Sequence, residues 1–176
     1  MKTNPLIRAI IILVILTLTI GCDQVSKKIV REKLGYYQSI EYLHNHFTIE
    51  KVENTGAFLS LGDSVSRPLR IIFLNVIPLI LIVIALGYIL IKTEIKPLTL
   101  FAIILMIGGG IGNIYDRFAR GSVTDFLYID LGGPFHTGVF NVADLFITTG
   151  VCIVVLQSWF KKKPEVVVPV VEESQI

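Results

Sequence analysis

The stretch GGGIGNIYDR, from Gly108 to Arg117, decides the fold because it ends one long apolar run with a glycine cluster and several polar side chains. It is followed by VTDF (residues 123–126) and by FNVAD (residues 140–144), after which another apolar run begins. Two neighbouring spans therefore deliver Asp125 and Asp144 to one edge of a membrane. Acidic groups at such a depth are costly, and their usual explanation is functional. We expect these two carboxylates to form an acid–base pair.

The composition excludes an ordinary soluble protein. Of the 176 residues, 53% are hydrophobic and 17% are charged, and the apolar residues occur in long unbroken blocks. The net charge of +2 is not gathered into a basic stripe, so no nucleic-acid partner is predicted. Cys22 and Cys152 lie at or in apolar segments, which argues against a disulfide framework or a thiolate metal site. We therefore predict an integral membrane protein.

Four segments are predicted to span the membrane: residues 5–22, 71–91, 97–115 and 141–160. A helix needs about 20 residues to cross, so the first and last spans are short. In the first span Arg8 must extend its side chain to the headgroups, and in the last span Asp144 must be drawn into the interface. These spans predict a single domain over residues 1–160, followed by a cytoplasmic tail without regular structure at residues 161–176.

The longest polar stretch, residues 23–70, is predicted to fold on the membrane surface. Residues 23–34 have the spacing of a short amphipathic helix, and alternation further on predicts a small sheet within residues 36–66. His44 and His46 have no third ligand nearby, so no metal site is predicted. The predicted fold class is an all-α membrane protein of four transmembrane helices, with a small extracytoplasmic sheet and a short amphipathic helix on the membrane surface.

The density of Lys and Arg predicts the orientation of the chain. With four spans, residues 1–8, 92–96 and 161–176 lie on one side and hold seven basic residues among 29. The other side holds nine basic residues among 77, so the denser side is predicted to face the cytoplasm. Both termini are then cytoplasmic, and Asp125 and Asp144 face outward.

The glycine cluster contains the pattern Gly108-x-x-x-Gly112, which lets two helix backbones approach closely. A nucleotide-binding loop is excluded, because no strand precedes the glycines and they lie inside a span. We expect close packing of the third and fourth spans at this pattern. Such packing would bring the two carboxylates together at the ends of those spans.

Two neighbouring carboxylates have the chemistry of an aspartic hydrolase. They cannot both ionise cheaply in a low dielectric, so the pKa of one rises and the pair holds one proton. One carboxylate can then take a proton from water while the other donates to a carbonyl oxygen. The residues alone leave three alternatives open. Asp144 could be a helix-capping residue after Asn141, the acids could form a proton or ion pathway, and Cys22 could be a lipidation site.

Five short motifs, in order along the chain, resemble those of the bacterial lipoprotein signal peptidase family, also called signal peptidase II. The motifs are Asp23-Gln24 with Lys27, Asn54 to Phe58, Gly109 to Arg117, Val123 to Phe126, and Phe140 to Asp144. The resemblance covers the chain apart from the tail after Lys163. It implies an aspartic endopeptidase of the bacterial inner membrane that removes the signal peptide of a diacylglyceryl-modified prolipoprotein just before its lipidated cysteine.

The resemblance also assigns roles to individual residues. It implies that Asp125 and Asp144 are the catalytic dyad, and that Cys22 is the end of the first span. No metal or cofactor is implied, and the partners are the prolipoprotein and membrane lipid, with the enzyme acting as a monomer. Substrate-binding or supporting roles are implied for Asp23, Lys27, Asn54, Gly56, Phe58, Asn113, Asp116, Arg117, Asn141 and Ala143.

Overall fold

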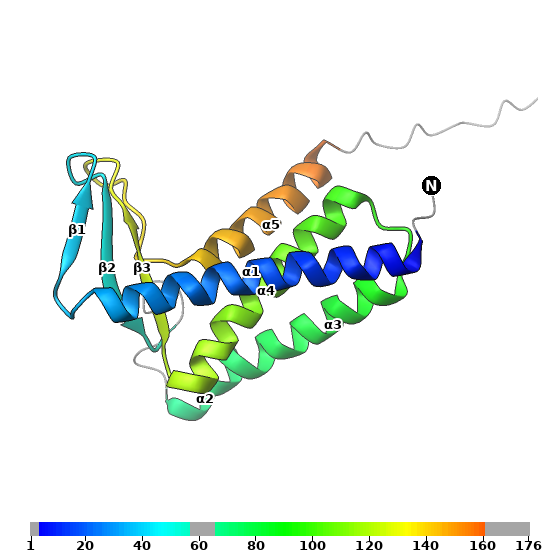
Figure 1. The fold of residues 1–176 in the computed structure, drawn as a ribbon, viewed down its shortest axis with the longest axis horizontal. Coiled ribbons are helices and arrows are strands. Elements are labelled where there is room, and N and C mark those ends of the chain that lie inside the picture. Colours follow the sequence, from blue (N-terminus) through cyan, green and yellow to red (C-terminus); the bar gives the residue numbers. More distant parts are fainter. Residues whose placement is uncertain (1–3, 57–65, 161–176) are drawn as a thin grey trace, which may run out of the picture.

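The structure is a computed structural model that describes residues 4–56 and 66–160 (Figure 1). Helix α4 packs against α1, α3 and α5, and the small sheet lies at one end of the helix bundle, opposite the N-terminus. The elements in chain order are α1 (Pro5–Lys33), β1 (Ser39–Tyr42), β2 (Phe47–Asn54), α2 (Arg67–Ile71), the π-helical turn η2 (Ile72–Val76), α3 (Ile77–Ile91), α4 (Pro97–Arg120), β3 (Val123–Ile129) and α5 (Val142–Trp159).

Four helical segments in the described part of the chain are long and apolar enough to cross a membrane. They are Pro5–Lys33, Pro68–Ile91, Pro97–Arg120 and Val142–Trp159. Many large apolar side chains on these helices are exposed, which fits helices whose outer faces contact lipid instead of water. The predicted fold class, four apolar spans with a small antiparallel sheet, is confirmed.

The first helix extends well beyond residue 22, where the sequence places the end of the first span. Helix α1 continues to Lys33, so the short surface helix predicted at residues 23–34 is not a separate element. Asp23, which follows the predicted end of the span, and Lys27, one turn further on, are both 0% exposed and pair with each other inside the bundle. A helix can continue through such residues because their charges are compensated within the protein.

The second span is irregular next to Pro78. In the turn η2, the N–H of Ile77 donates to the carbonyl of Ile72, five residues earlier, as in a π-helix. Proline lacks an N–H and crowds the carbonyl four residues before it, here that of Leu74. The wider π-helical turn leaves space for this carbonyl. The turn lies at the end of the second span that is near the sheet.

The sheet is antiparallel with strand order β1-β2-β3, and its third strand was not predicted. The predicted sheet region, residues 36–66, holds β1 and β2, whereas β3 comes from the segment after α4. The pairing of β2 with β3 shifts register between Ile49 and Val52, and Val52 then lies opposite Asp125. The sheet thus places Asp125 beside the end of β2, although the two segments are far apart in the sequence.

The glycines of α4 face three different helices, and Gly110 is the one that faces α3 at Ile82. A Cβ on Gly108 would lie 2.7 Å from the Thr19 side chain, and one on Gly112 would contact the Asp23 carboxylate, so both glycines face α1. The close approach of α4 to α5 instead uses Gly109 and Gly150. The predicted close packing of the third and fourth spans is present, but its glycines are mainly Gly109 and Gly150. Gly108 and Gly112 turn chiefly toward α1, because successive helical residues point about 100° apart.

We expect Gly109→Ala to destabilise the protein. The added Cβ would lie 2.5 Å from the carbonyl oxygen of Ala143, a backbone atom that cannot move aside cheaply. Overpacking of this kind lowers the free energy of unfolding by about 1–3 kcal/mol. The measurement is the thermal unfolding temperature in detergent, which should fall. The matched control is Gly87→Ala, where nothing lies within 4 Å of the new Cβ. Equal unfolding temperatures for the two variants would contradict this packing.

Candidate active site

Asp125 and Asp144 line one small cavity where β3 meets the start of α5. Asp125 lies on β3 and is 3% exposed, whereas Asp144 lies in the first turn of α5 and is half-buried. The cavity has a volume of about 50 Å³, which is enough to hold water. Its other lining residues are Asn54, Asn113, Arg117, Val123 and Asn141.

Asp125 is held by two amide groups. The Nδ2 of Asn54 donates to its Oδ2 at 2.8 Å, and the Nδ2 of Asn141 donates to its Oδ1 at 2.6 Å. Burial, the largest cause, and the nearby charge of Asp144 together raise the pKa of Asp125 to about 6, while the two amide hydrogen bonds oppose the shift. Asp125 therefore keeps its proton up to about pH 6.

Asp144 caps its own helix and faces the cavity at the same time. Its Oδ2 accepts the backbone N–H of Asn141 at 3.1 Å, and the Oδ1 of Asn141 accepts the N–H of Asp144 at 3.0 Å. This reciprocal pair is a capping box. The capping role that the sequence left open is therefore present, and it fixes Asp144 in the cavity instead of competing with a chemical role.

Two asparagines connect the carboxylates. The Nδ2 of Asn113 donates to Asp144 Oδ1 at 2.8 Å, and its Oδ1 accepts from Asn141 Nδ2 at 3.2 Å. Since the same Nδ2 of Asn141 also donates to Asp125, a continuous series of hydrogen bonds runs from Asp144 to Asp125. The relative position of the two acids is thus set by amide side chains.

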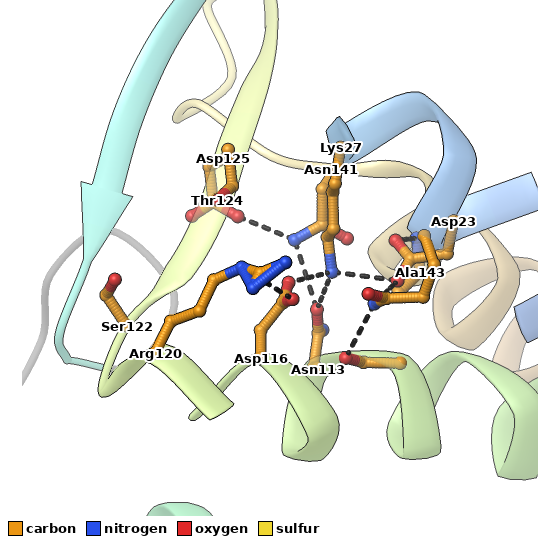
Figure 2. Close-up of polar contacts among 12 residues, drawn as sticks. Asp23, Lys27, Asn113, Asp116, Arg120, Ser122, Thr124, Asp125, Asn141 and Ala143 are labelled. Atoms are coloured by element: carbon orange, nitrogen blue, oxygen red, sulfur yellow. Dashed lines mark hydrogen bonds and ion pairs between the residues drawn. The ribbon is translucent and has the colours of Figure 1, made fainter. Parts of the chain in front are cut away.

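Lys27 is the central residue of the polar cluster that orients these asparagines (Figure 2). It is 0% exposed, and its Nζ lies 2.9 Å from each of three acceptors: Asp23 Oδ2, Asp116 Oδ2 and Asn113 Oδ1. The contacts with Asp23 and Asn113 are hydrogen bonds, and the contact with Asp116 is an ion pair. Because lysine only donates, the oxygen of Asn113 must face Lys27, and its amide N–H must then face Asp144.

Asp23 joins α1 to the start of α5. Its Oδ1 accepts the backbone N–H of Ala143 at 3.0 Å, while its Oδ2 accepts from Lys27 and Gln24. This contact satisfies one of the N–H groups that every helix leaves unpaired in its first turn. Asp23 and Ala143 therefore support the turn that carries Asp144, and neither residue lines the cavity.

Arg117 connects the cavity to a larger groove. Its Nη2 donates to the carbonyl of Gly56 at 3.2 Å, and the N–H of Gly56 donates in turn to Asn54 Oδ1. Arg117 also lines a groove of about 430 Å³ that contains apolar and polar side chains. The other groove residues are Thr55, Arg70, Ile71, Leu74, Asn75, Phe118 and Gly121.

The remaining predicted site residues lie elsewhere. Asp116 does not line the cavity; its carboxylate lies near Lys27, with Arg31 at 3.6 Å and Arg120 at 4.0 Å. Phe58 lies outside the described residues. Among residues 4–56 and 66–160, no group of three or more His, Cys, Asp or Glu side chains could hold a metal ion.

The residues that hold β3 in place were not predicted from the sequence. Arg31 Nη1 donates to Thr124 Oγ1 at 3.1 Å, and the Thr124 hydroxyl donates to Glu53 at 3.0 Å. These bonds tie the strand that carries Asp125 to both α1 and β2. Asn75, in the groove, was also missed, although a lone amide within an apolar span is a recognisable signal.

We expect Lys27→Met to destabilise the protein strongly. The substitution keeps the length of the side chain but leaves Asp23 and Asp116 without their shared cation. Removing one partner of a buried ion pair costs about 3–5 kcal/mol. The neighbouring variant Lys28→Met is the control: that side chain is 69% exposed, so the change should stay within about 0.5 kcal/mol. Similar unfolding temperatures for the two variants would show that the cluster contributes little.

We expect the stability of the fold to fall as the pH rises from about 4 to about 6. The pKa of Asp125 is about 6 in the folded protein and 3.8 as its ordinary value, so the folded state binds more protons within this window. Above pH 6 the cost of burying the charged form is fully present, and it amounts to at most about 3 kcal/mol.

Thermal unfolding of the wild type and of Asp125→Asn, measured at several pH values, tests this dependence. The variant should lose the slope between pH 4 and pH 6 whatever its absolute stability. The control Asp130→Asn removes a carboxylate that binds the N–H of Gly132 outside the cavity, and it should keep the slope. A slope that persists unchanged in Asp125→Asn would assign the proton uptake to another group.

Comparison with known proteins places this architecture in a family. Residues 14–160 match the family described as Signal peptidase (SPase) II. The lipoprotein signal peptidase of Francisella tularensis subsp. novicida (strain U112) is 35% identical over 147 residues, which cover 83% of this chain and 89% of that protein. The lipoprotein signal peptidase of Borrelia hermsii (strain HS1 / DAH) is 33% identical over 164 residues, which cover 90% of this chain and 94% of the relative.

A solved structure, described as a bacterial membrane enzyme determined by the in meso method, has the same fold. Its TM-score is 0.74 at 25% sequence identity, and the match covers 88% of this chain and 92% of that one. The family match begins within α1 and covers the three later apolar helices and the sheet, together with both aspartates of the cavity. The chain therefore belongs to the signal peptidase II family, whose members are bacterial membrane proteases that process lipoproteins.

Proposed function

We propose that this protein is an intramembrane aspartic endopeptidase that cleaves the signal peptide from diacylglyceryl-modified prolipoproteins, just before the lipidated cysteine. The observation that carries the proposal is the shared cavity of Asp125 and Asp144, in which both carboxylates are held by hydrogen bonds to amide groups. Membership of the signal peptidase II family supports the substrate class. The raised pKa of Asp125 supports the aspartic mechanism.

The two carboxyl groups take different roles in this mechanism. Asp144, in its ionised form, accepts a proton from a water molecule in the cavity as that water attacks the scissile carbonyl carbon. Asp125, in its protonated form, donates its proton to the carbonyl oxygen, which gives a neutral tetrahedral diol. The diol collapses as Asp144 returns a proton to the leaving nitrogen and Asp125 recovers its own from a hydroxyl group. The dyad thus ends with the single proton it held at the start.

The position of the cavity suits a lipid-anchored substrate. It lies where α4 and α5 meet the sheet, at one end of the membrane-spanning bundle. A cysteine carrying diacylglycerol keeps its acyl chains in the bilayer, so its peptide bond stays close to the membrane boundary. The groove beside Arg117 offers apolar walls at Leu74 and Phe118 and polar groups at Asn75, which fit an extended peptide next to the scissile bond.

The proposal also includes the arrangement in the membrane. The density of Lys and Arg supports cytoplasmic termini and a site near the outer face of the inner membrane. The enzyme acts as a single-domain monomer whose partners are the prolipoprotein and membrane lipid, without a metal or cofactor. The segment from Asn54 to Phe58 is proposed to hold the lipidated substrate at the interface, since Asn54 and Gly56 already contact the dyad and Arg117.

We expect Asp125→Asn and Asp144→Asn each to abolish cleavage. An amide cannot exchange the proton, and the loss of a general acid or base lowers the rate by about 10² to 10⁴ or more. The double variant should be no worse than either single variant, because the pair acts as a unit. The measurement is cleavage of a purified diacylglyceryl prolipoprotein in detergent, followed by the mass of the released signal peptide.

Two further substitutions make this experiment decisive. Asp130→Asn is the matched control outside the cavity and should keep its activity, whereas Asp116→Asn should lower stability more than the rate per folded molecule. Thermal unfolding is measured for every variant, because an amide at position 125 would place an N–H₂ group opposite Asn54 or Asn141. Substantial cleavage by folded Asp125→Asn or Asp144→Asn would end the dyad assignment, and inactive wild-type protein would favour a proton or ion pathway.

A further inference from the structure

Two cavities lie at the end of the bundle opposite the sheet, where α1 begins and the α3–α4 loop (residues 92–96) turns back into the bundle. Their volumes are about 700 and 210 Å³. Both are lined by Arg8, Thr93, Ile95 and Pro97, so they adjoin each other at these residues. Neither cavity is part of the candidate active site.

Arg8 is the cation between the two cavities, and it is only 9% exposed. Its Nη2 donates to the carbonyl of Lys92 at 2.8 Å, which uses one of the five N–H donors of a guanidinium group. It forms no ion pair with any carboxylate of residues 4–56 and 66–160. A buried charge inside a spanning segment is costly without a counter-charge, so a bound anion would stabilise the guanidinium group of Arg8.

Two helix N-termini reinforce the preference for an anion. The first residues of α1 and α4, Pro5 and Pro97, both line the larger cavity. Neither helix has an acidic residue in its first turn, so the positive ends of both helix dipoles are uncompensated there. Lys96, at the N-cap of α4, adds a second cation, whereas Glu94 is the acidic side chain on the lining and is exposed.

The walls of the smaller cavity indicate which anion fits. Apart from Arg8 and Thr93, it is lined by apolar residues, which continue along the lipid-facing side of α1 and α4 through Ile11 and Phe101. A free phosphate ion would leave these walls uncovered, whereas the acyl chains of a lipid would cover them. Basic pockets between membrane helices are typical binding sites of anionic headgroups.

We propose that this end of the bundle binds an anionic phospholipid, whose phosphate lies against Arg8 and Lys96 and whose acyl chains lie along Ile11 and Phe101. The ligand class is a phosphodiester lipid with a net negative charge, such as phosphatidylglycerol. The site lies at the opposite end of the bundle from the candidate active site and is separate from the peptidase chemistry. Its test therefore does not depend on cleavage activity.

Native mass spectrometry of the purified protein tests the proposal. The protein is incubated with phosphatidylglycerol or with phosphatidylcholine of the same acyl chains, and the bound fractions are compared. We expect phosphatidylglycerol to bind at least about fivefold more tightly, as one basic contact to an anionic headgroup predicts. In a separate arm, inorganic phosphate should displace little lipid. Strong displacement would show that the site takes free phosphate, and equal binding of the two lipids would overturn the proposal.

Substitutions localise the binding. Arg8→Gln should remove the preference for phosphatidylglycerol, whereas Lys92→Gln, which neutralises a lysine of the same loop that does not line either cavity, should retain it. If Arg8→Gln fails to fold because the bond to the Lys92 carbonyl is lost, Lys96→Gln decides instead. The side chain of Lys96 is exposed, and its loss should weaken binding about fivefold relative to Lys92→Gln. Equal binding by Lys96→Gln and Lys92→Gln would then refute the site.

Discussion

The buried ammonium of Lys27 is the interaction on which the rest of the site depends. Three acceptors at 2.9 Å surround it, and two of them are carboxylates. The cluster joins α1, through Asp23, to α4, through Asp116 and Asn113. An ion of this kind tolerates burial only when every N–H is satisfied and opposite charge is close. The helices that supply the acceptors are consequently fixed in depth and rotation relative to one another.

The Lys27 cluster also positions the two acids, through hydrogen bonds whose donors and acceptors are fixed by the lysine. Lys27 orients the amide of Asn113, which donates to Asp144, and Asn141 connects Asn113 to Asp125. Asp144 lies in a helix turn that its own capping box and the Ala143 N–H contact hold in place. Asp125 is more deeply buried, on a strand, and burial raises its pKa to about 6. Two chemically identical side chains thus acquire different environments, which is how paired carboxylates take separate roles.

The close approach of the helices makes this arrangement possible. Gly109 lies against the backbone of Ala143, and Gly112 lies against the Asp23 carboxylate. A side chain at either position would hold the helices apart and lengthen contacts between them that are now 2.9 to 3.0 Å long. Glycine is costly in a helix, yet here it lets polar groups from three helices meet in a space closed to lipid.

The sequence by itself determined the four spans, and it singled out Asp125, Asp144 and a possible cap at Asn141, because hydropathy, isolated charge and capping patterns are local properties. Only the tertiary structure decided that α1 continues past Asp23, since burial of Lys27 in that part of the helix depends on Asp116, which lies nearly ninety residues away in the chain. The sequence likewise did not predict the strand that carries Asp125, because the hydrogen bonds of that strand are made to β2. Which glycine faces which helix is a matter of rotation, and rotation is set by packing between segments that are distant in the sequence.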